Sequence, residues 1–195
     1  LPLEGGNDEL TAESLRLADS AAGKKKLYEE QLGYTRRLLE PEYSKYLRTR
    51  DQHRYRQHVA SLLHRLKRFA EMRAFCRAQQ KLVEDRHVAQ DFARRIAYSF
   101  RDEEKHEDAI QAFEDVFVGY PQITSDWWNL QMEIARCLER LGRRKEAIQA
   151  ARIAFDAAEH GNVNSPGWLI INNLKELDRG KVERANAFVR HTYFG

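Results

Sequence analysis

Proline and glycine are scarce in this sequence, with four Pro and ten Gly among 195 residues. An all-β fold needs many turn residues, so this scarcity disfavours one. No stretch approaches the roughly 20 consecutive apolar residues of a membrane-spanning helix. The first six residues lack the basic start and the long apolar run of a secretory signal peptide. What the chain does contain is 42% hydrophobic and 32% charged residues, which predicts a soluble protein with a large polar surface.

Cysteine is also scarce. Cys76 and Cys137 form neither a disulfide framework nor a CxxC metal motif, so we interpret them as free, buried thiols in a reducing compartment. The sequence has no HExxH, GxSxG, P-loop or GxGxxG motif. Its seven histidines show no ligand pattern, and the carboxylates of residues 102–108 fall in a predicted turn. We therefore predict no enzymatic activity, no cofactor and no metal.

Basic residues are concentrated in the first half of the chain. Residues 24–101 carry 20 Lys and Arg against 9 Asp and Glu, although the whole chain has a net charge of only +3. A block with this excess attracts acidic partners. The alternative interpretation is a solvated basic helix surface.

The segment before residue 52 is predicted to have two parts. Residues 1–23 are polar and rich in small residues, which indicates a loose arm with a short helix over 10–18. Residues 24–51 indicate basic helices. The apolar spacing predicts a helix over 24–39, Pro41 ends it, and a tyrosine-bearing segment follows over 42–50.

From about residue 52 the sequence repeats itself. In each unit a small or apolar residue stands five positions after a turn, in the pairs Lys67 and Met72, Glu104 and Ala109, Gly142 and Ala147, and Gly180 and Ala185. The second members follow one another at 37, 38 and 38 residues. Self-similarity at such a period indicates a solenoid of helix pairs.

Within each unit the apolar residues recur at spacings of three and four, which indicates two amphipathic helices. Ala60, Ala97 and Ala135 are expected where the first helix crosses the second, because a larger side chain would separate the pair. The predicted fold is therefore all-α, with an array over 52–195 and repeats near 53–88, 90–124, 127–163 and 166–195. The expected helix-end signals are Pro121, Asp126, Gly161 and Ser165-Pro166.

This pattern resembles the tetratricopeptide-repeat (TPR) family, whose usual repeat is 34 residues, so each unit here is about one helical turn longer. The resemblance implies a protein–protein interaction scaffold with a concave groove lined by the first helix of each repeat. Carried over position by position, it places the following residues in that groove: Arg54, Gln57, Ser61, His64 and Arg65; Asp91, Arg94, Tyr98, Arg101 and Asp102; Asn129, Met132, Arg136, Glu139 and Arg140.

The planar guanidinium of arginine donates two parallel hydrogen bonds to a carboxylate held at a fixed geometry. We therefore predict a basic groove for an acidic partner segment, either extended or helical. Its proposed contact residues are Arg54, Gln57, His64, Arg65, Arg94, Tyr98, Arg101, Met132, Arg136 and Arg140. We expect reversal of Arg94, Arg101 and Arg136 to Glu to abolish partner binding without unfolding the array. In the alternative interpretation, these arginines pair with acidic residues of neighbouring repeats.

The fourth repeat departs from this pattern. Its equivalent positions are Gly167, Ile170, Leu174, Leu177 and Asp178. Such an apolar face is expected to be covered by residues 188–194 or by a partner. The asparagines of the chaperone-binding TPR clamp are missing, which argues against binding of a heat-shock chaperone tail.

Nucleic acid is a competing class of ligand. Five tyrosines stand among the arginines of the basic block, where they could stack on bases: Tyr28, Tyr34, Tyr43, Tyr46 and Tyr55. No RNA-binding motif accompanies them, and tyrosines at helical spacing are more often part of a core.

Three loose patterns are similar to the TPR subunit of the outer-dynein-arm docking complex. They are a tyrosine-bearing helix and basic segment over 34–51, Trp127-Trp128 followed by residues 133–137, and residues 158–162 leading to Trp168. The chain lacks that family's first TPR block and acidic tail. The resemblance implies a non-catalytic adaptor on ciliary doublet microtubules, with coiled-coil docking subunits, dynein or tubulin as partners.

The expected location is intracellular, in the cytoplasm or the cytoskeleton, and the dynein resemblance narrows it to the axoneme of a cilium. The alternative is a soluble peptide-binding TPR module with a chaperone or regulatory role. An RNA-binding protein comes third.

Overall fold

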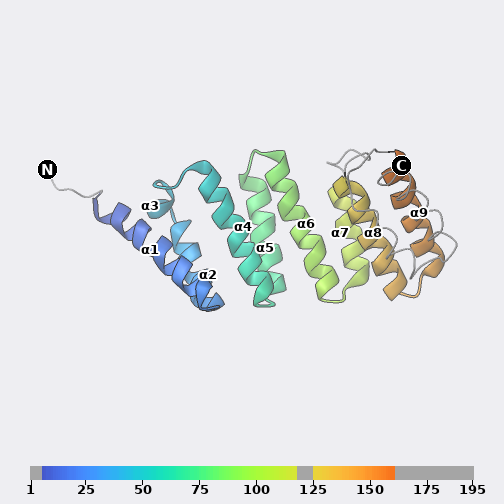
Figure 1. Cartoon of the computed structure of the whole chain (residues 1–195), viewed down its shortest axis with the longest axis horizontal. Helices are drawn as coiled ribbons and strands as arrows, with labels where there is room; N and C mark the ends of the chain where they lie inside the picture. Colours follow the sequence, from blue (N-terminus) through green and yellow to red (C-terminus); the bar gives the residue numbers. More distant parts are fainter. Residues whose placement is uncertain (1–5, 118–124, 161–195) are drawn as a thin grey trace, which may run out of the picture. The chain divides into compact units, whose positions relative to one another are not determined.

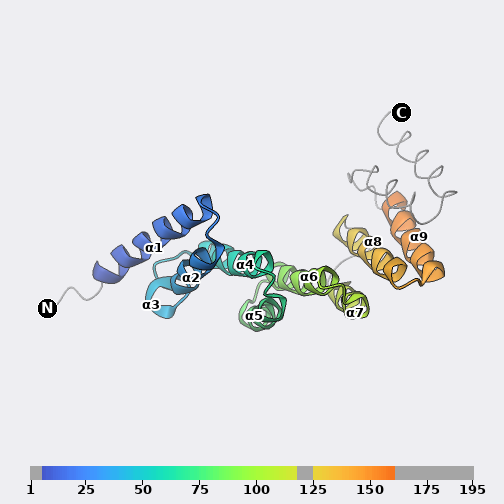
Figure 2. The same ribbon diagram turned by 90° about the horizontal axis from the view of Figure 1, so that it is seen from below.

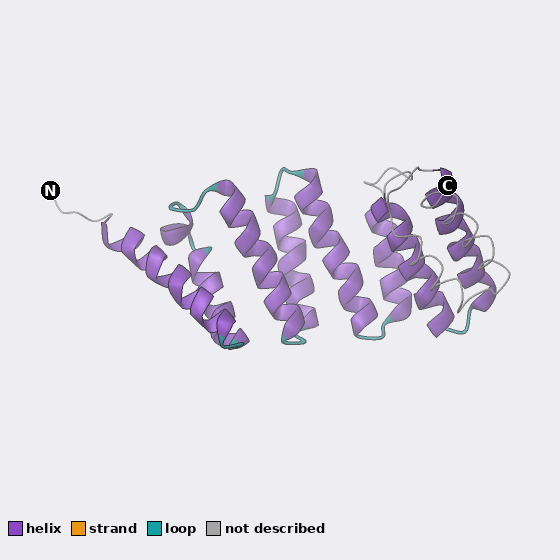
Figure 3. Cartoon of the chain, viewed as in Figure 1, coloured by secondary structure: helices purple, strands orange, loops and turns teal. Residues whose placement is uncertain are grey.

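A computed structural model of the chain describes residues 6–117 and 125–160. All regular elements in these ranges are helices (Figures 1 and 3). The chain divides into two compact units, residues 1–99 and 100–195. We call them the first and the second unit and describe each by itself.

The first unit contains α1 (Gly6–Lys24), α2 (Tyr28–Leu38), the short α3 (Pro41–Ser44), α4 (Thr49–Arg65), α5 (Phe69–Leu82) and most of α6 (Arg86–Asp102). The second unit contains the end of α6, then α7 (His106–Phe117), α8 (Ser125–Arg140) and α9 (Arg144–His160). This arrangement confirms the predicted all-α fold of TPR-like helix pairs. None of the described helices has both the length and the apolar character needed to cross a bilayer.

Four turns join the helix pairs, and they share one backbone geometry. Lys26, Lys67, Glu104 and Gly142 have φ angles of 58°, 57°, 61° and 73°. At the α4–α5 turn, the Lys67 N–H donates to the carbonyl of His64 and the Arg68 N–H to that of Leu63, both at 2.9 Å. The other three turns make the same two bonds. This is the Schellman motif, which ends a helix with one left-handed residue.

The turns at Lys67, Glu104 and Gly142 are those that the repeat pattern predicts. The turn at Lys26 identifies a further helix pair, α1 and α2, that the sequence pattern did not reveal. Its anchor position, five residues after the turn, holds the polar residue Gln31, which is 7% exposed. The helix expected over 10–18 lies within the longer helix α1, so residues 6–23 are helical and do not form a loose arm. Helix α1 has 19 residues and packs against α2.

The core of the first unit lies between α4, α5 and α6, and α5 is set to one side of the other two helices (Figure 2). Ala60 and Ala97 are 0% exposed, as the repeat pattern requires. A second cluster, which includes Leu38 and Tyr55, joins α1 to the segment from α2 to α4. Tyr34, Tyr43 and Tyr46 pack against this cluster, so four of the five tyrosines considered for base stacking serve the core.

The core of the second unit has the same small-residue seam. Ala109, Ala135 and Ala147 are each 0% exposed, and Phe113 and Leu130 fill the space between the helices. The predicted fourth pair at Gly180 and Ala185, the apolar face of repeat four, and the helix-end signals at Pro121, Gly161 and Ser165-Pro166 lie outside the described residues.

Candidate functional site

Three clefts lie along α4 in the first unit, and adjoining clefts share lining residues. Their volumes are about 810 Å³ at the N-terminal end of α4, about 520 Å³ in the middle and about 240 Å³ at its C-terminal end. Arg54 and Gln57 line both the first and the middle cleft. Ser61 and Arg95 line both the middle and the third. We call the three clefts together the α4 groove.

The α4 groove has the dimensions of a peptide-binding site. Helix α4 has 17 residues, which gives a length of about 25 Å at 1.5 Å per residue. An extended chain advances about 3.3 Å per residue, so a groove of this length holds about seven or eight residues of a partner.

The helix pair that the sequence pattern missed supplies one wall of this groove. Arg16, Asp19 and Ser20 of α1 and Gln31 of α2 line the middle cleft, together with residues of α4 and α6. Sequence reasoning missed these wall residues because the polar residue Gln31, and not a small or apolar one, holds the anchor position of the α1–α2 turn. The left-handed residue of this turn is Lys26, within the Lys24–Lys26 run.

A polar network fixes the spacing of α4 and α6 across the middle of the groove. The Asp91 carboxylate accepts hydrogen bonds from Gln57 Nε2 at 3.1 Å and from Arg95 Nε at 3.0 Å. Nη1 of Arg95 donates to Ser61 Oγ at 2.9 Å. Gln57 and Ser61 of α4 thus connect the first repeat to α6 of the second. The positive charge of Arg95 is paired with the negative charge of Asp91.

A second network joins α4 to the α1–α2 pair. Nε2 of Gln31 donates to Nε2 of His58 at 2.9 Å, and the same ring nitrogen lies 3.8 Å from Oδ1 of Asp19. The hydroxyl of Thr35 donates to that carboxylate oxygen at 2.6 Å. Burial lowers the pKa of His58, and the nearby Asp19 only partly opposes this effect. The neutral ring is therefore the form that this contact with Gln31 favours.

Arg54 occupies the point where the first and middle clefts meet. Its guanidinium lies 5.4 Å from the centre of the Tyr55 ring, and Tyr55 itself is buried. The ion pair of Arg54 with Asp51 is long, at 3.8 Å, and the Arg54 side chain is 70% exposed. The stacked ring orients the guanidinium and leaves its polar edge toward solvent, which suits contact with a partner.

The C-terminal end of the groove is less charged. His64, Arg65 and Tyr98 line the third cleft together with Met72. The His64 ring packs edge-on against Phe69 with centroids 5.4 Å apart. Arg65 lies over the ring of Tyr28 at 5.4 Å.

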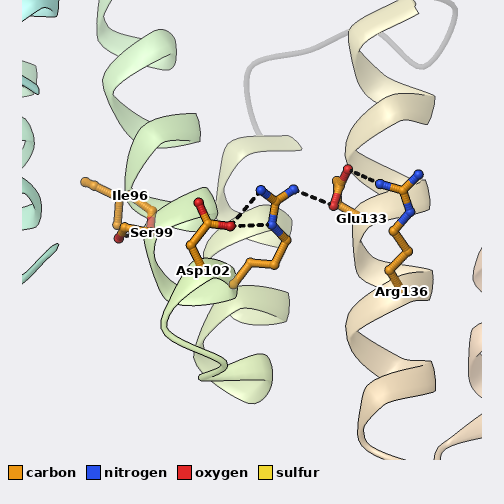
Figure 4. Close-up of polar contacts among 6 residues, drawn as sticks. Ile96, Ser99, Asp102, Glu133 and Arg136 are labelled. Carbon is orange, nitrogen blue, oxygen red and sulfur yellow. Dashed lines mark hydrogen bonds and ion pairs between the residues drawn. The ribbon is translucent and has the colours of Figure 1, made fainter. Parts of the chain in front are cut away.

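The predicted site residues of the second unit lie in a different environment. A cleft of about 550 Å³ is lined by Arg101, Arg136 and Arg140, together with Asp102, Glu104, His106 and Cys137. Nη1 of Arg101 donates to Oε2 of Glu133 at 2.8 Å, and Nη1 of Arg136 donates to Oε1 of the same residue at 2.8 Å. Figure 4 shows Glu133 between the two helices, facing Arg136 along α8.

Arg101 is held on its other side by Asp102, whose Oδ1 accepts from Nε at 2.9 Å and from Nη2 at 2.7 Å. Burial works to lower the pKa of Arg101, but the hydrogen bonds to Glu133 and Asp102 outweigh it and leave the pKa raised. For Arg101 and Arg136 the structure thus matches the alternative interpretation, in which the arginines pair with acids of the array.

The structure brings together part of the predicted contact set. Arg54, Gln57, His64, Arg65 and Tyr98 line the α4 groove. Arg94 is half-buried on α6 and lies outside the lining of these clefts. Met132 is 2% exposed, so we leave it out of the proposed contact surface.

Neither cysteine is placed for chemistry. Cys76 and Cys137 are free and buried, and burial raises the pKa of their thiols to about 12 and about 11. Within the described ranges, no group of three or more His, Cys, Asp or Glu residues is arranged to hold a metal ion.

No protein-family model and no curated protein matches the sequence. Solved structures do resemble it. The TPR-like repeat protein of Podosopora anserina described as a kinesin light chain is 12% identical, covers 92% of this chain and 93% of its own, and has a TM-score of 0.58.

PlcR of Bacillus thuringiensis, solved in complex with the peptide PapR7 and DNA, is 13% identical over 94% of this chain and 69% of its own, with a TM-score of 0.58. MamA of Desulfovibrio magneticus RS-1 is 12% identical over 93% of this chain and 92% of its own, with a TM-score of 0.53. At these identities the likeness shows the fold alone: the chain has a TPR-like repeat fold.

Proposed function

We propose that the protein is a non-catalytic protein–protein interaction module that binds an extended segment of a partner in the α4 groove. The observation that carries this proposal is the continuity of three clefts along one helix, with shared lining residues at each junction. The groove matches the length of a short peptide, and its polar side chains suit backbone and side-chain hydrogen bonds.

The fold supports this type of function, because TPR-like arrays present side chains of their first helices to a partner. One similar structure, PlcR, was solved with a bound peptide. The finer hypothesis of a dynein-arm docking adaptor rests only on the loose residue patterns described above. None of the similar structures named here is a dynein-arm protein.

RNA binding receives less support from the geometry. Tyr55 is buried, and Tyr34, Tyr43 and Tyr46 pack against the same cluster. Cations lie over four of the tyrosine rings, those of Tyr28, Tyr43, Tyr46 and Tyr55. Base stacking needs an open aromatic face, and in these tyrosines core packing or a cation covers a face of the ring.

A displayed library of random peptides tests the proposal directly. We expect the protein to enrich peptides that lose binding when Ser20→Trp fills the middle cleft, because Ser20 is exposed and lines that cleft. The matched control is Ser14→Trp on the same helix, where the exposed serine bonds only within α1. Selected peptides that bind both variants equally, or no enrichment at all, would exclude the α4 groove as the site.

A further inference from the structure

Arginines line the α4 groove along its whole length, but they differ in how closely each is paired with an acidic or aromatic side chain. The cleft at the N-terminal end of α4 is lined by three arginines and a histidine, Arg48, Arg50, Arg54 and His53, against two carboxylates, Asp51 and Asp85. The middle cleft shares Arg54 with the first cleft, and its other two arginines are paired, Arg95 with Asp91 at 3.0 Å and Arg16 with Glu13 at 2.9 Å. The C-terminal cleft shares Arg95 with the middle cleft and adds Arg65, which lies over a tyrosine ring.

The two carboxylates at the N-terminal end neutralise this cluster only in part. Asp51 is shared between Arg48 at 3.4 Å and Arg54 at 3.8 Å, both longer than a well-formed ionic hydrogen bond. Asp85 is engaged elsewhere, since its Oδ1 accepts from the backbone N–H groups of His87 and Val88 at the start of α6. The Arg48 side chain is 92% exposed and that of Arg54 is 70% exposed.

The positive charges at this end of the groove destabilise one another and the start of α4. Arg48 precedes α4, and Arg50 lies in its first turn. Cations are disfavoured at the positive end of a helix dipole, and like charges held close together repel each other. A negatively charged group placed between these side chains relieves both effects.

We infer that this end of the groove recognises a cluster of carboxylates in the partner, so that the partner lies with its acidic part against Arg48, Arg50 and Arg54. This inference rests on the proposed function and adds the charge and the placement of the bound segment. The residues lining this cleft include no Phe, Tyr or Trp on which a base could stack, which favours an acidic peptide over a nucleic acid.

The probe is a fluorescein-labelled peptide of about eight residues, the length that fits α4 in extended form, with glutamates in one half and serine and glycine in the other. Fluorescence anisotropy compares it with a lysine peptide, an uncharged peptide and a single-stranded RNA. We expect binding of the glutamate peptide alone, and we expect it to weaken as salt screens the exposed charges.

The double variant Arg48→Glu with Arg50→Glu is expected to weaken glutamate-peptide binding at least about tenfold, because it removes two attractive pairs and adds repulsion. Arg77→Glu with Lys81→Glu makes the same charge change at exposed positions of α5 and is expected to leave the affinity unchanged. The neutral pair Arg48→Gln with Arg50→Gln gives an intermediate loss, and it replaces the reversal if circular dichroism shows that the reversal unfolds.

Equal losses in the groove and α5 variants would overturn the inference, because net charge alone would then explain binding. Tighter binding of the RNA, lost with the same substitutions, would also overturn it. If library peptides require the middle cleft but are not acidic, the proposed function stands and the carboxylate inference fails.

Discussion

Nη1 of Arg101 donates a hydrogen bond of 2.8 Å to Oε2 of Glu133, and this contact joins the end of α6 to α8. Glu133 also accepts from Arg136 on its other oxygen. The Glu133 side chain is 12% exposed, so both guanidiniums lose a largely buried acceptor if it is removed. A residue predicted to bind a partner thus helps to stabilise the repeat junction.

The first prediction concerns this junction. Glu133→Ala is expected to lower the free energy of unfolding by about 2 kcal/mol, because it removes a largely buried acceptor that two guanidiniums share. Urea denaturation followed by circular dichroism measures the change. Glu146→Ala is the control. It removes the partner of Arg143 in an exposed pair three residues apart, so no measurable change is expected. Equal effects of the two variants would contradict a structural role for Glu133.

The same contact changes the expected outcome of reversing arginines in the predicted groove. Arg101→Glu and Arg136→Glu would place two further carboxylates beside Glu133. We expect these reversals to destabilise the second unit, so loss of partner binding in such a variant would not locate the site. Arg48 and Arg50 are better positions for reversal because they lie on the surface of the first unit.

The second prediction uses two glycines with opposite roles. Gly142 has a φ of 73°, a conformation that a side chain disfavours, so Gly142→Ala is expected to lower the free energy of unfolding by about 1 kcal/mol. Gly33 lies inside α2, and a Cβ added there meets no atom within 4 Å. Gly33→Ala is therefore expected to raise stability by about 1 kcal/mol, the helix propensity difference. Thermal unfolding measures both, and shifts of the same sign would contradict the assigned conformations.

Much of the fold follows from local rules that a sequence displays. Ala60, Ala97 and Ala135 mark the helix crossings because only a small side chain fits there, and all three are 0% exposed. The α1–α2 pair escapes the same rule because Gln31 holds its anchor position. A polar residue can be buried there only because His58, 27 positions later, provides a hydrogen-bond partner. A hydrogen bond between residues so far apart in the sequence cannot be predicted until the helices are placed in space.

The site is predictable only in part for a related reason. Periodicity identifies which face of a helix a residue occupies, so it brings Arg54, Gln57 and Tyr98 to one groove. It does not identify the partner of a charged side chain on a neighbouring helix. The pattern predicts that both Arg101 and Arg54 face the groove, yet Arg101 is bonded to Glu133 at 2.8 Å while the ion pair of Arg54 with Asp51 is 3.8 Å long.

The third prediction is a pH dependence that originates at His58. Burial lowers its pKa in the folded state below the ordinary value of 6.5. The unfolded state therefore binds more protons in this range, and stability falls as the pH drops from 6.5 toward the lowered value. The groups facing the ring are Asp19 on α1, Gln31 on α2, and Arg54 and Arg65 on α4.

We expect His58→Asn to remove this component, because asparagine keeps a polar side chain but has no proton to gain. Urea midpoints measured between about pH 7 and about pH 5, where histidine ordinarily titrates, should fall more steeply for the wild-type protein than for the variant. The carboxylates titrate in both proteins, so the difference between the two slopes isolates His58. His53→Asn, at a half-buried position near the start of α4, controls for loss of any histidine. Parallel slopes for wild type and His58→Asn would show that protonation of His58 does not oppose folding, and that its contact with Gln31 does not depend on a neutral ring.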